Sequence, residues 1–157
     1  MKTAVKKEVE KYLLSICYTV PASLVEAWDL LATDSGFARW FPQLRVEGDK
    51  LVFEMEDFHE TMDLLAYRPH EVIAYTWDTA RVSFSLSRQE QQMQINFEED
   101  IPVDFGNEFA DAKKDMTGWL VQNECIKNLL EGQDLPGRQP LQEKWSAFLE
   151  KELSCRK

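Results

Sequence analysis

The side chains that could do chemistry are few in this sequence, and they lie far apart. Two histidines, His59 and His70, and three cysteines, Cys17, Cys125 and Cys155, are the usual candidates for metal ligands or nucleophiles. Neither histidine has a second His or Cys at the helical or strand spacing of a zinc site, which favours two surface histidines. Cys17 and Cys125 fall in apolar segments, where a thiol more often packs as a small core residue than acts as a nucleophile.

One predicted hairpin carries a row of polar side chains that could hold a divalent cation. Hard cations prefer oxygen ligands, but a convincing calcium site also needs a loop with ligands at fixed spacing, which the sequence lacks. A solvated strand face is therefore the favoured interpretation. Motifs for hydrolases, P-loops, dinucleotides and zinc proteases are absent too, so we expect no metal, no cofactor and no catalytic residue. By strand parity the row consists of Glu54, Glu56, His59, Thr61 and Asp63.

The feature that best indicates a function is the apolar face that several strands share with a long helix. Ligand pockets are mostly apolar with a few placed polar groups, and the Tyr75 hydroxyl and Asn123 could serve as those groups. The same residues could instead form a filled core, with Asn123 satisfied by a backbone group or water. We assign no Asp, Glu, His or Lys to this face. The candidate ligand-binding residues are Trp40, Phe41, Phe53, Met62, Leu64, Tyr75, Trp77, Phe84, Ile95, Met116, Leu120 and Asn123.

The elements that position these residues begin with a strand and two short helices. Residues 11–20 are rich in β-branched and aromatic types and stop at Pro21, which predicts the first strand. Ser23 and Glu26 form a Ser-x-x-Glu capping box that opens the first helix. Asp34 is expected to cap a second short helix that ends at residues 40–42.

A meander of strands and a long helix follow. Between residues 51 and 97 short runs alternate apolar and polar side chains, which is typical of antiparallel strands with one apolar face. An acidic loop, Glu98–Asp100, is expected next. A helical pattern then runs from about Glu108 to Glu131, with Gly132 as its stop. The order predicts an α+β fold, with the helix covering the apolar face of the sheet.

The chain divides into one domain and a tail. Residues 1–132 are expected to form the domain, and residues 133–140, which include Pro136 and Gly137, a linker. Residues 141–157 predict a short amphipathic helix with Trp145 and Phe148 on its apolar side. This helix either docks on the domain or meets a second subunit in a homodimer.

Several segments resemble one protein family. Val20–Ser23, Ala27–Leu31 and Thr33–Phe41 are similar to the entry segment of START-like (SRPBCC) proteins. Arg68–Trp77 is similar to a central turn and strand of one branch, named after the activator of the ninety-kilodalton heat-shock protein's ATPase. Thr117–Trp119 resembles the start of that branch's closing helix.

The resemblance covers residues 9 to 132, and it implies a helix-grip fold. In that fold a curved antiparallel sheet grips the long C-terminal helix, two short helices follow the first strand, and a cavity lies between sheet and helix. One segment departs from the pattern. The family often has a Gly-Thr pair at the last hairpin, where this chain has Gln89–Gln92.

Composition limits the partners and the compartment. The net charge of −10 disfavours nucleic acid and anionic membrane surfaces as partners. Residues 1–11 contain no apolar signal-peptide core, and no run of apolar residues is long enough to cross a membrane. An odd number of unpaired cysteines indicates a reducing compartment. We therefore expect a cytoplasmic protein.

Three hypotheses for the function follow from these observations. The first is non-enzymatic binding of a small apolar molecule in the cavity. The alternative, which the resemblance implies, is a co-chaperone-like module with a filled core that binds a protein client, showing an apolar patch near Trp145 and Phe148. The third is an enzyme of the cyclase or aromatase kind found in the wider superfamily. It ranks last because it needs a buried titratable group in the cavity.

Overall fold

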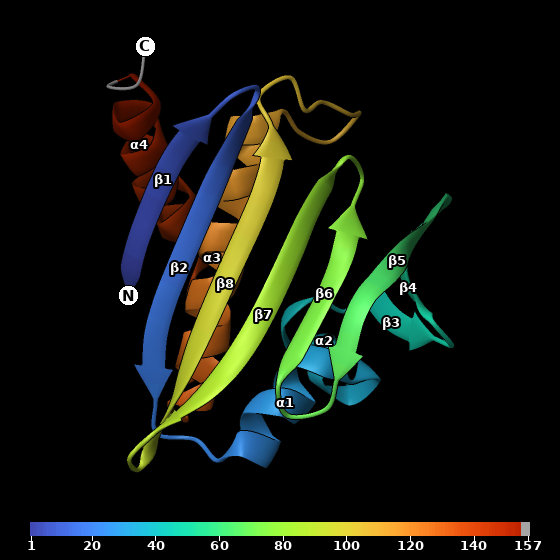
Figure 1. Ribbon diagram of the computed structural model, residues 1–157, viewed down its shortest axis with the longest axis vertical. Coiled ribbons are helices and arrows are strands. Elements are labelled where there is room, and N and C mark those ends of the chain that lie inside the picture. Colours follow the sequence, from blue (N-terminus) through green and yellow to red (C-terminus); the bar gives the residue numbers. More distant parts are fainter. Residues whose placement is uncertain (155–157) are drawn as a thin grey trace.

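Eight antiparallel strands form one sheet in the computed structural model, which describes residues 1–154 (Figure 1). The order across the sheet is β1-β2-β8-β7-β6-β5-β4-β3. The strands are β1 (Lys2–Glu8), β2 (Lys11–Val20), β3 (Leu44–Glu47), β4 (Lys50–Met55), β5 (Phe58–Arg68), β6 (Val72–Trp77), β7 (Ala80–Gln89) and β8 (Gln92–Pro102). The helices of this part of the chain are α1 (Leu24–Ala32), α2 (Asp34–Trp40), α3 (Ala112–Leu130) and α4 (Arg138–Ser154).

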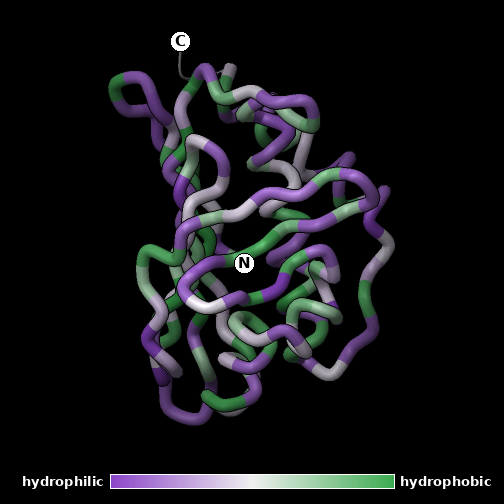
Figure 2. The backbone as a smooth tube through the Cα atoms, turned by 90° about the vertical axis from the view of Figure 1, so that its right-hand side faces the viewer, coloured by the Kyte–Doolittle hydropathy of each residue, from purple (hydrophilic) through white to green (hydrophobic). Residues whose placement is uncertain are grey.

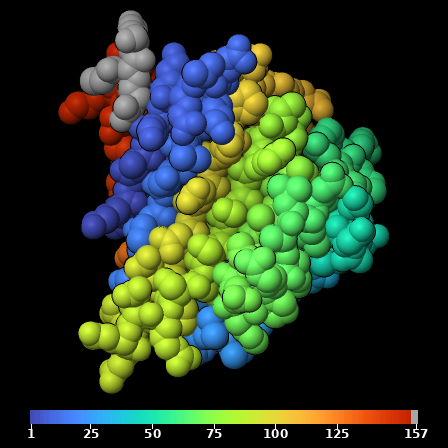
Figure 3. Space-filling view, in the orientation of Figure 1, coloured from blue at the N-terminus to red at the C-terminus, as the bar shows by residue number. Residues whose placement is uncertain are grey.

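The helices of the domain pack on one face of the curved sheet. Helix α3 contacts β2 and β8, and α1 contacts β7. Figure 3 shows the opposite, outer face, where the strands lie side by side and cover most of the view. The α+β helix-grip arrangement predicted from the sequence is therefore confirmed.

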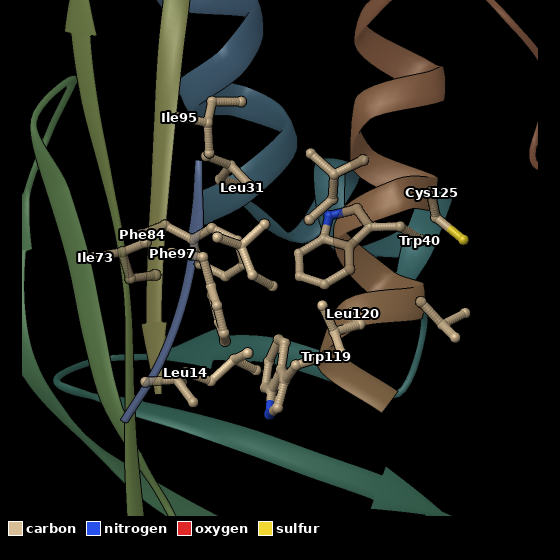
Figure 4. Packing of buried hydrophobic residues seen from close by; sticks show 14 of the residues in the cluster. Leu14, Leu31, Trp40, Ile73, Phe84, Ile95, Phe97, Trp119, Leu120 and Cys125 are labelled. Atoms are coloured by element: carbon tan, nitrogen blue, oxygen red, sulfur yellow. The ribbon is translucent and has the colours of Figure 1, made fainter. Parts of the chain in front are cut away.

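Strand alternation builds the core, as the sequence indicated. Along β8 every second side chain is buried, which points one row of residues at α3. In Figure 4, Phe84 and Phe97 of the sheet face Trp119 of α3, and the rings of Phe97 and Trp119 are 5.1 Å apart. The part of the interior between β7, β8 and α3 is therefore a filled core.

Hydrophobic and hydrophilic residues mix along the whole chain in Figure 2. Such mixing is expected where each element has one buried and one solvated side. Along residues 1–154, no helix combines the length and the hydrophobicity that crossing a membrane requires.

The start of α1 has the predicted capping box. The Ser23 hydroxyl accepts a hydrogen bond from the Glu26 amide (3.1 Å), and the Glu26 carboxylate accepts one from the Ser23 amide (3.4 Å). The cap of α2 differs from the prediction, because Thr33 accepts from the Gly36 amide. Asp34 is the first residue of α2, and its carboxylate accepts from the Val46 amide (2.7 Å) instead.

Several elements differ from the sequence prediction. Strand β1 was not predicted, because Val5 is its only buried residue and no alternation shows. Residues 98–100 are not a loop, since β8 continues through them to Pro102 in register with β2. Helix α3 begins at Ala112 rather than near Glu108, because Asp111 caps it by accepting from the Lys114 amide. Its stop at Gly132, where φ is +78°, is confirmed.

The tail packs against α3 of the same chain. Helix α4 begins at Arg138, before the predicted start at Leu141, with Pro140 tolerated in its first turn. Trp145 and Leu149 are buried, and the Trp145 indole donates to the Glu124 carboxylate (2.7 Å). The apolar side of the tail is therefore used within its own chain. Cys155 lies outside the described residues.

Candidate functional site

A cavity of about 660 Å³ lies between α2, β4 to β6 and the first half of α3. Its volume falls within the range of about 300–1,000 Å³ that is usual for small-molecule sites. Exposed side chains surround its mouth: Met55, Phe109 and Leu135. The walls are formed by Trp40, Phe41, Phe53, Phe58, Glu60, Met62, Trp77, Asp78, Asn107, Asp115, Gln122 and Arg138, among others.

Aromatic rings make up the greater part of the inner wall. Phe41 packs edge-to-face on Trp77 (5.7 Å between ring centres) and on Phe53 (6.0 Å). Phe58 meets Phe109 in the same geometry at 4.9 Å. Phe41, Phe53 and Trp77 are only partly buried, so their rings border the cavity. Such rings can stack on a flat apolar molecule or lie against a cation.

The structure divides the predicted site residues between the cavity and the filled core. Leu64 packs against the core without lining the cavity. The six predicted site residues that lie within the core have 0–1% of their surface exposed. The apolar face is thus partly the wall of a cavity and partly a filled core. Trp40, Phe41, Phe53, Met62 and Trp77 line the cavity, whereas Tyr75, Phe84, Ile95, Met116, Leu120 and Asn123 lie in the core.

Asn123 is a core residue with its amide satisfied inside the protein. Its oxygen accepts a hydrogen bond from the Tyr18 hydroxyl (2.8 Å), and its nitrogen donates to the Trp119 carbonyl (2.9 Å). It therefore holds α3 to β2 and does not project a polar group into the cavity.

Two carboxyl groups that the sequence analysis missed lie at the inner end of the cavity. Asp115, in the first turn of α3, lines the cavity, and its carboxylate accepts a hydrogen bond from the Trp77 indole (3.0 Å). Behind it is Glu99 of β8, which has no exposed surface. If both groups were ionised, the Glu99 oxygens would have no donor. A proton on Glu99 would turn one of these oxygens into a donor toward Asp115, and this interaction is one cause of the raised pKa of Glu99.

Burial sets the proton equilibrium of this pair. Burial, and then the hydrogen bond to Asp115, raise the pKa of Glu99 well above its ordinary value. Burial also raises the pKa of Asp115, although hydrogen bonds from Glu99 and Trp77 oppose that shift. Of the two groups, Glu99 therefore keeps its proton to the higher pH, and that proton can be donated to Asp115.

The expectation that no titratable residue falls on the inner face of the strands is wrong. Met93, Ile95 and Phe97 share that face, and counting on by two reaches Glu99 and then Ile101. The signal was present in the alternation. It was missed because three acidic residues in a row suggest a loop, whereas here they continue a central strand.

The polar row on the outer hairpin face is fully solvated. Glu54 pairs with Arg45 (3.0 Å), and Asp63 pairs with Lys50. Among residues 1–154, no three His, Cys, Asp or Glu side chains gather closely enough to hold a metal ion. Cys17 and Cys125, both in the described part of the chain, are free thiols, and Cys125 is buried.

Comparison with known proteins gives relatives in structure only. No family model matches the sequence, and no curated protein matches it. A conserved protein of unknown function from Enterococcus faecalis superposes with a TM-score of 0.81 at 22% identity, covering 96% of this chain and 92% of that one. CalU16 from Micromonospora echinospora gives 0.69 at 14% identity, covering 96% of both chains.

A third similar structure matches only part of this chain. The Aha1 dimer from Colwellia psychrerythraea matches with a TM-score of 0.61 at 19% identity, covering 76% of this chain and 96% of that one. Likeness at these identities shows the fold and nothing finer. Together with the sheet order and the gripped helix α3, it shows that this chain has the START-like helix-grip fold.

Proposed function

We propose that this protein binds a small, largely apolar molecule in the cavity between β4 to β6 and α3. The observation that carries the proposal is the partly buried aromatic wall of Phe41, Phe53 and Trp77 around about 660 Å³ of space. A protein that only needed a core would gain about 25 cal/mol for each Å² of apolar surface removed from water by closing this space. The rings instead border an open cavity, which suits a ligand that completes their burial.

The interaction-module alternative takes support from the likeness to the Aha1 dimer. That hypothesis expected a filled interior and an exposed apolar patch near Trp145 and Phe148. Trp145 is 6% exposed because it packs on α3, and the interior contains the cavity. These two observations favour ligand binding over client binding.

The enzyme hypothesis required a buried titratable group, which the Glu99–Asp115 pair supplies. Glu99 has no exposed surface and does not line the cavity, so its proton faces Asp115 rather than a substrate. We therefore assign the pair to ligand recognition.

The test uses a neutral aromatic probe and two matched variants. We expect 2-(1-naphthyl)ethanol to bind the wild-type chain, with quenching of tryptophan fluorescence, because Trp40 and Trp77 line the cavity. Phe53→Ala should weaken binding about tenfold, since an aromatic contact contributes about 0.5–1.5 kcal/mol beyond its area. Phe148→Ala removes an equally half-buried ring from α4, away from the cavity, and should leave the affinity unchanged.

Native mass spectrometry of the purified protein provides an independent measurement. Extra mass that disappears on denaturation would identify an occupied cavity. Absence of both a retained molecule and any probe binding would contradict the proposal, as would an equal effect of the two Phe→Ala substitutions.

A further inference from the structure

We propose that Asp115 selects the class of ligand: a compact organic cation, such as a protonated amine on an aromatic or apolar body. The Asp115 carboxylate is the counter-ion, and the aromatic wall surrounds the rest of the molecule. This inference rests on the proposed function and makes it specific.

The first support is a partly buried carboxyl group, that of Asp115, without a positive partner. Asp115 is held in place by Trp77 and backed by Glu99, yet neither carboxyl group takes part in an ion pair within residues 1–154. A buried charge is costly unless it is paired and hydrogen-bonded. An ammonium group arriving from the cavity would provide both the charge and the N–H donors.

A second, independent observation is a buried hydroxyl with no partner. The Tyr75 hydroxyl is fully buried and has no hydrogen-bond partner. Tyr75 and Glu99 share a row across the sheet, since each pairs with Val82 from opposite sides. Orphaned buried polar groups are uncommon in native proteins and need an explanation. The unpaired hydroxyl thus lies beside Glu99, the residue that backs Asp115, and adds a further polar group behind this wall of the cavity.

The charges of the cavity wall favour a cation over an anion. Glu60 and Asp78 line the same cavity as Asp115. Burial and the charge of Asp78 raise the pKa of Glu60, and Asp78 also raises the pKa of Asp115, so Asp78 repels both of the other carboxylates. A positive ligand relieves that repulsion, whereas a carboxylate or phosphate ligand adds to it.

The basic residues of the wall do not neutralise this end. Arg138 donates to the Trp40 carbonyl (3.1 Å) and to Gln122 (3.2 Å), so its guanidinium is engaged at the α4 side of the cavity. Arg39 lines the cavity from the exposed side of α2. The rings of Trp77 and Phe41, which border the same cavity as Asp115, can add cation–π attraction, which increases where water is excluded.

The test compares three probes of one shape and different charge. We expect 2-(1-naphthyl)ethylamine to bind wild-type protein at least about tenfold more tightly than 2-(1-naphthyl)ethanol, because hydrogen bonds to charged groups are about twice as strong as neutral ones. The anion 1-naphthylacetate should bind most weakly. Isothermal titration calorimetry at pH 7 gives the three dissociation constants.

Asp115→Asn should remove the preference for the amine while keeping the affinity for the alcohol, since asparagine can still accept from Trp77. The matched control is Glu108→Gln, which makes the same charge change at an exposed residue that does not line the cavity. It should retain the amine preference.

Each outcome decides between the two proposals. If the alcohol binds wild-type protein as tightly as the amine, cation selection is wrong and ligand binding stands. If Asp115→Asn keeps the amine preference, Asp115 is not the anchor and this inference fails. If none of the three probes binds and native mass spectrometry finds no retained molecule, the proposed function itself fails. The wild-type ranking decides the question even if Asp115→Asn does not fold.

Discussion

At the scale of single residues, Glu99 shows how one proton links the core to the site. Its side chain occupies a position on β8 between the buried residues Phe97 and Ile101, where an apolar residue would be the ordinary choice. Ionising it beside Asp115 would place two negative charges in a region of low dielectric constant. The folded protein therefore holds a proton that the unfolded chain releases above about pH 4.3.

This linkage predicts an unusual dependence of stability on pH. The folded-state pKa of Glu99 lies above its unfolded value of about 4.3. Its proton therefore stabilises the folded state fully below that value, and the contribution is lost as pH rises through the folded pKa. Glu99→Gln mimics the protonated acid. Above pH about 4.3 its free energy of unfolding should exceed that of wild type by a margin that grows by up to about 1.4 kcal/mol per pH unit.

Urea unfolding from pH 4 to pH 9 measures the effect. Glu98→Gln is the control, because the neighbouring Glu98 is exposed on the opposite face of the same strand. Parallel pH profiles for wild type and Glu99→Gln would show that Glu99 is ionised in the folded protein, and the description of the pair would be wrong.

At this scale the sequence predicted the ring residues of the site better than its charges. Large aromatic residues on a strand face, such as Phe53 and Trp77, are visible in the alternation, and both line the cavity. Whether a ring borders space or fills the core depends on neighbours far along the chain. Tyr75 is two residues before Trp77 on the same face, yet it is fully buried. No local pattern separates these two outcomes, because they depend on where α2 and α3 lie above the sheet.

At the scale of elements, the corner between α1 and α2 positions one wall of the cavity. Gly36, in the first turn of α2, lies so close to α1 that an added Cβ would overlap the Asp29 carbonyl oxygen and lie 2.5 Å from that of Leu30. The Trp40 indole donates to the same Leu30 carbonyl (2.8 Å). The close approach that Gly36 permits thus fixes the end of α2, where Trp40 and Phe41 border the cavity.

A pair of Gly→Ala substitutions tests this description. Gly36→Ala should destabilise the protein by about 3 kcal/mol, because the corner must open to relieve an overlap with backbone atoms. Gly118→Ala, in α3, meets no atom within 4 Å and should stabilise by about 0.5–1 kcal/mol through helix propensity. Thermal and urea unfolding give both values. A neutral Gly36→Ala would mean that the two helices are not packed this closely.

The sequence predicts an element correctly where the signal comes from adjacent residues, and it fails where the element depends on pairing with a distant strand. The Ser23–Glu26 box and the stop at Gly132 depend on a few adjacent residues, and both are confirmed. Strand β1 depends on backbone pairing with β2 and buries only Val5, so its Lys-rich sequence carries almost no periodic signal. The continuation of β8 through Glu98–Asp100 likewise depends on pairing with β2 and β7.

At the scale of the whole molecule, the two edges of the sheet are protected against pairing with another chain. Strand β1 carries Lys2, Lys6 and Lys7, and β3 is only four residues long. Short or lysine-rich edges are common means of preventing edge-to-edge association. The net charge of −10 adds repulsion between copies. The apolar side of α4 is already packed on α3, so it is not available to bind a second subunit.

We therefore predict that the chain sediments as a monomer of 18.3 kDa at micromolar concentrations. Trp145→Ala should lower the free energy of unfolding by about 3 kcal/mol, because it removes a ring that is 6% exposed and leaves the Glu124 carboxylate without its indole donor. Its sedimenting mass should equal that of wild type. A dimer held together by the tail would give the opposite pattern, with a doubled mass for wild type and a lower one for the variant. Analytical ultracentrifugation of both proteins over a tenfold concentration range distinguishes a tail that completes its own domain from one that joins two.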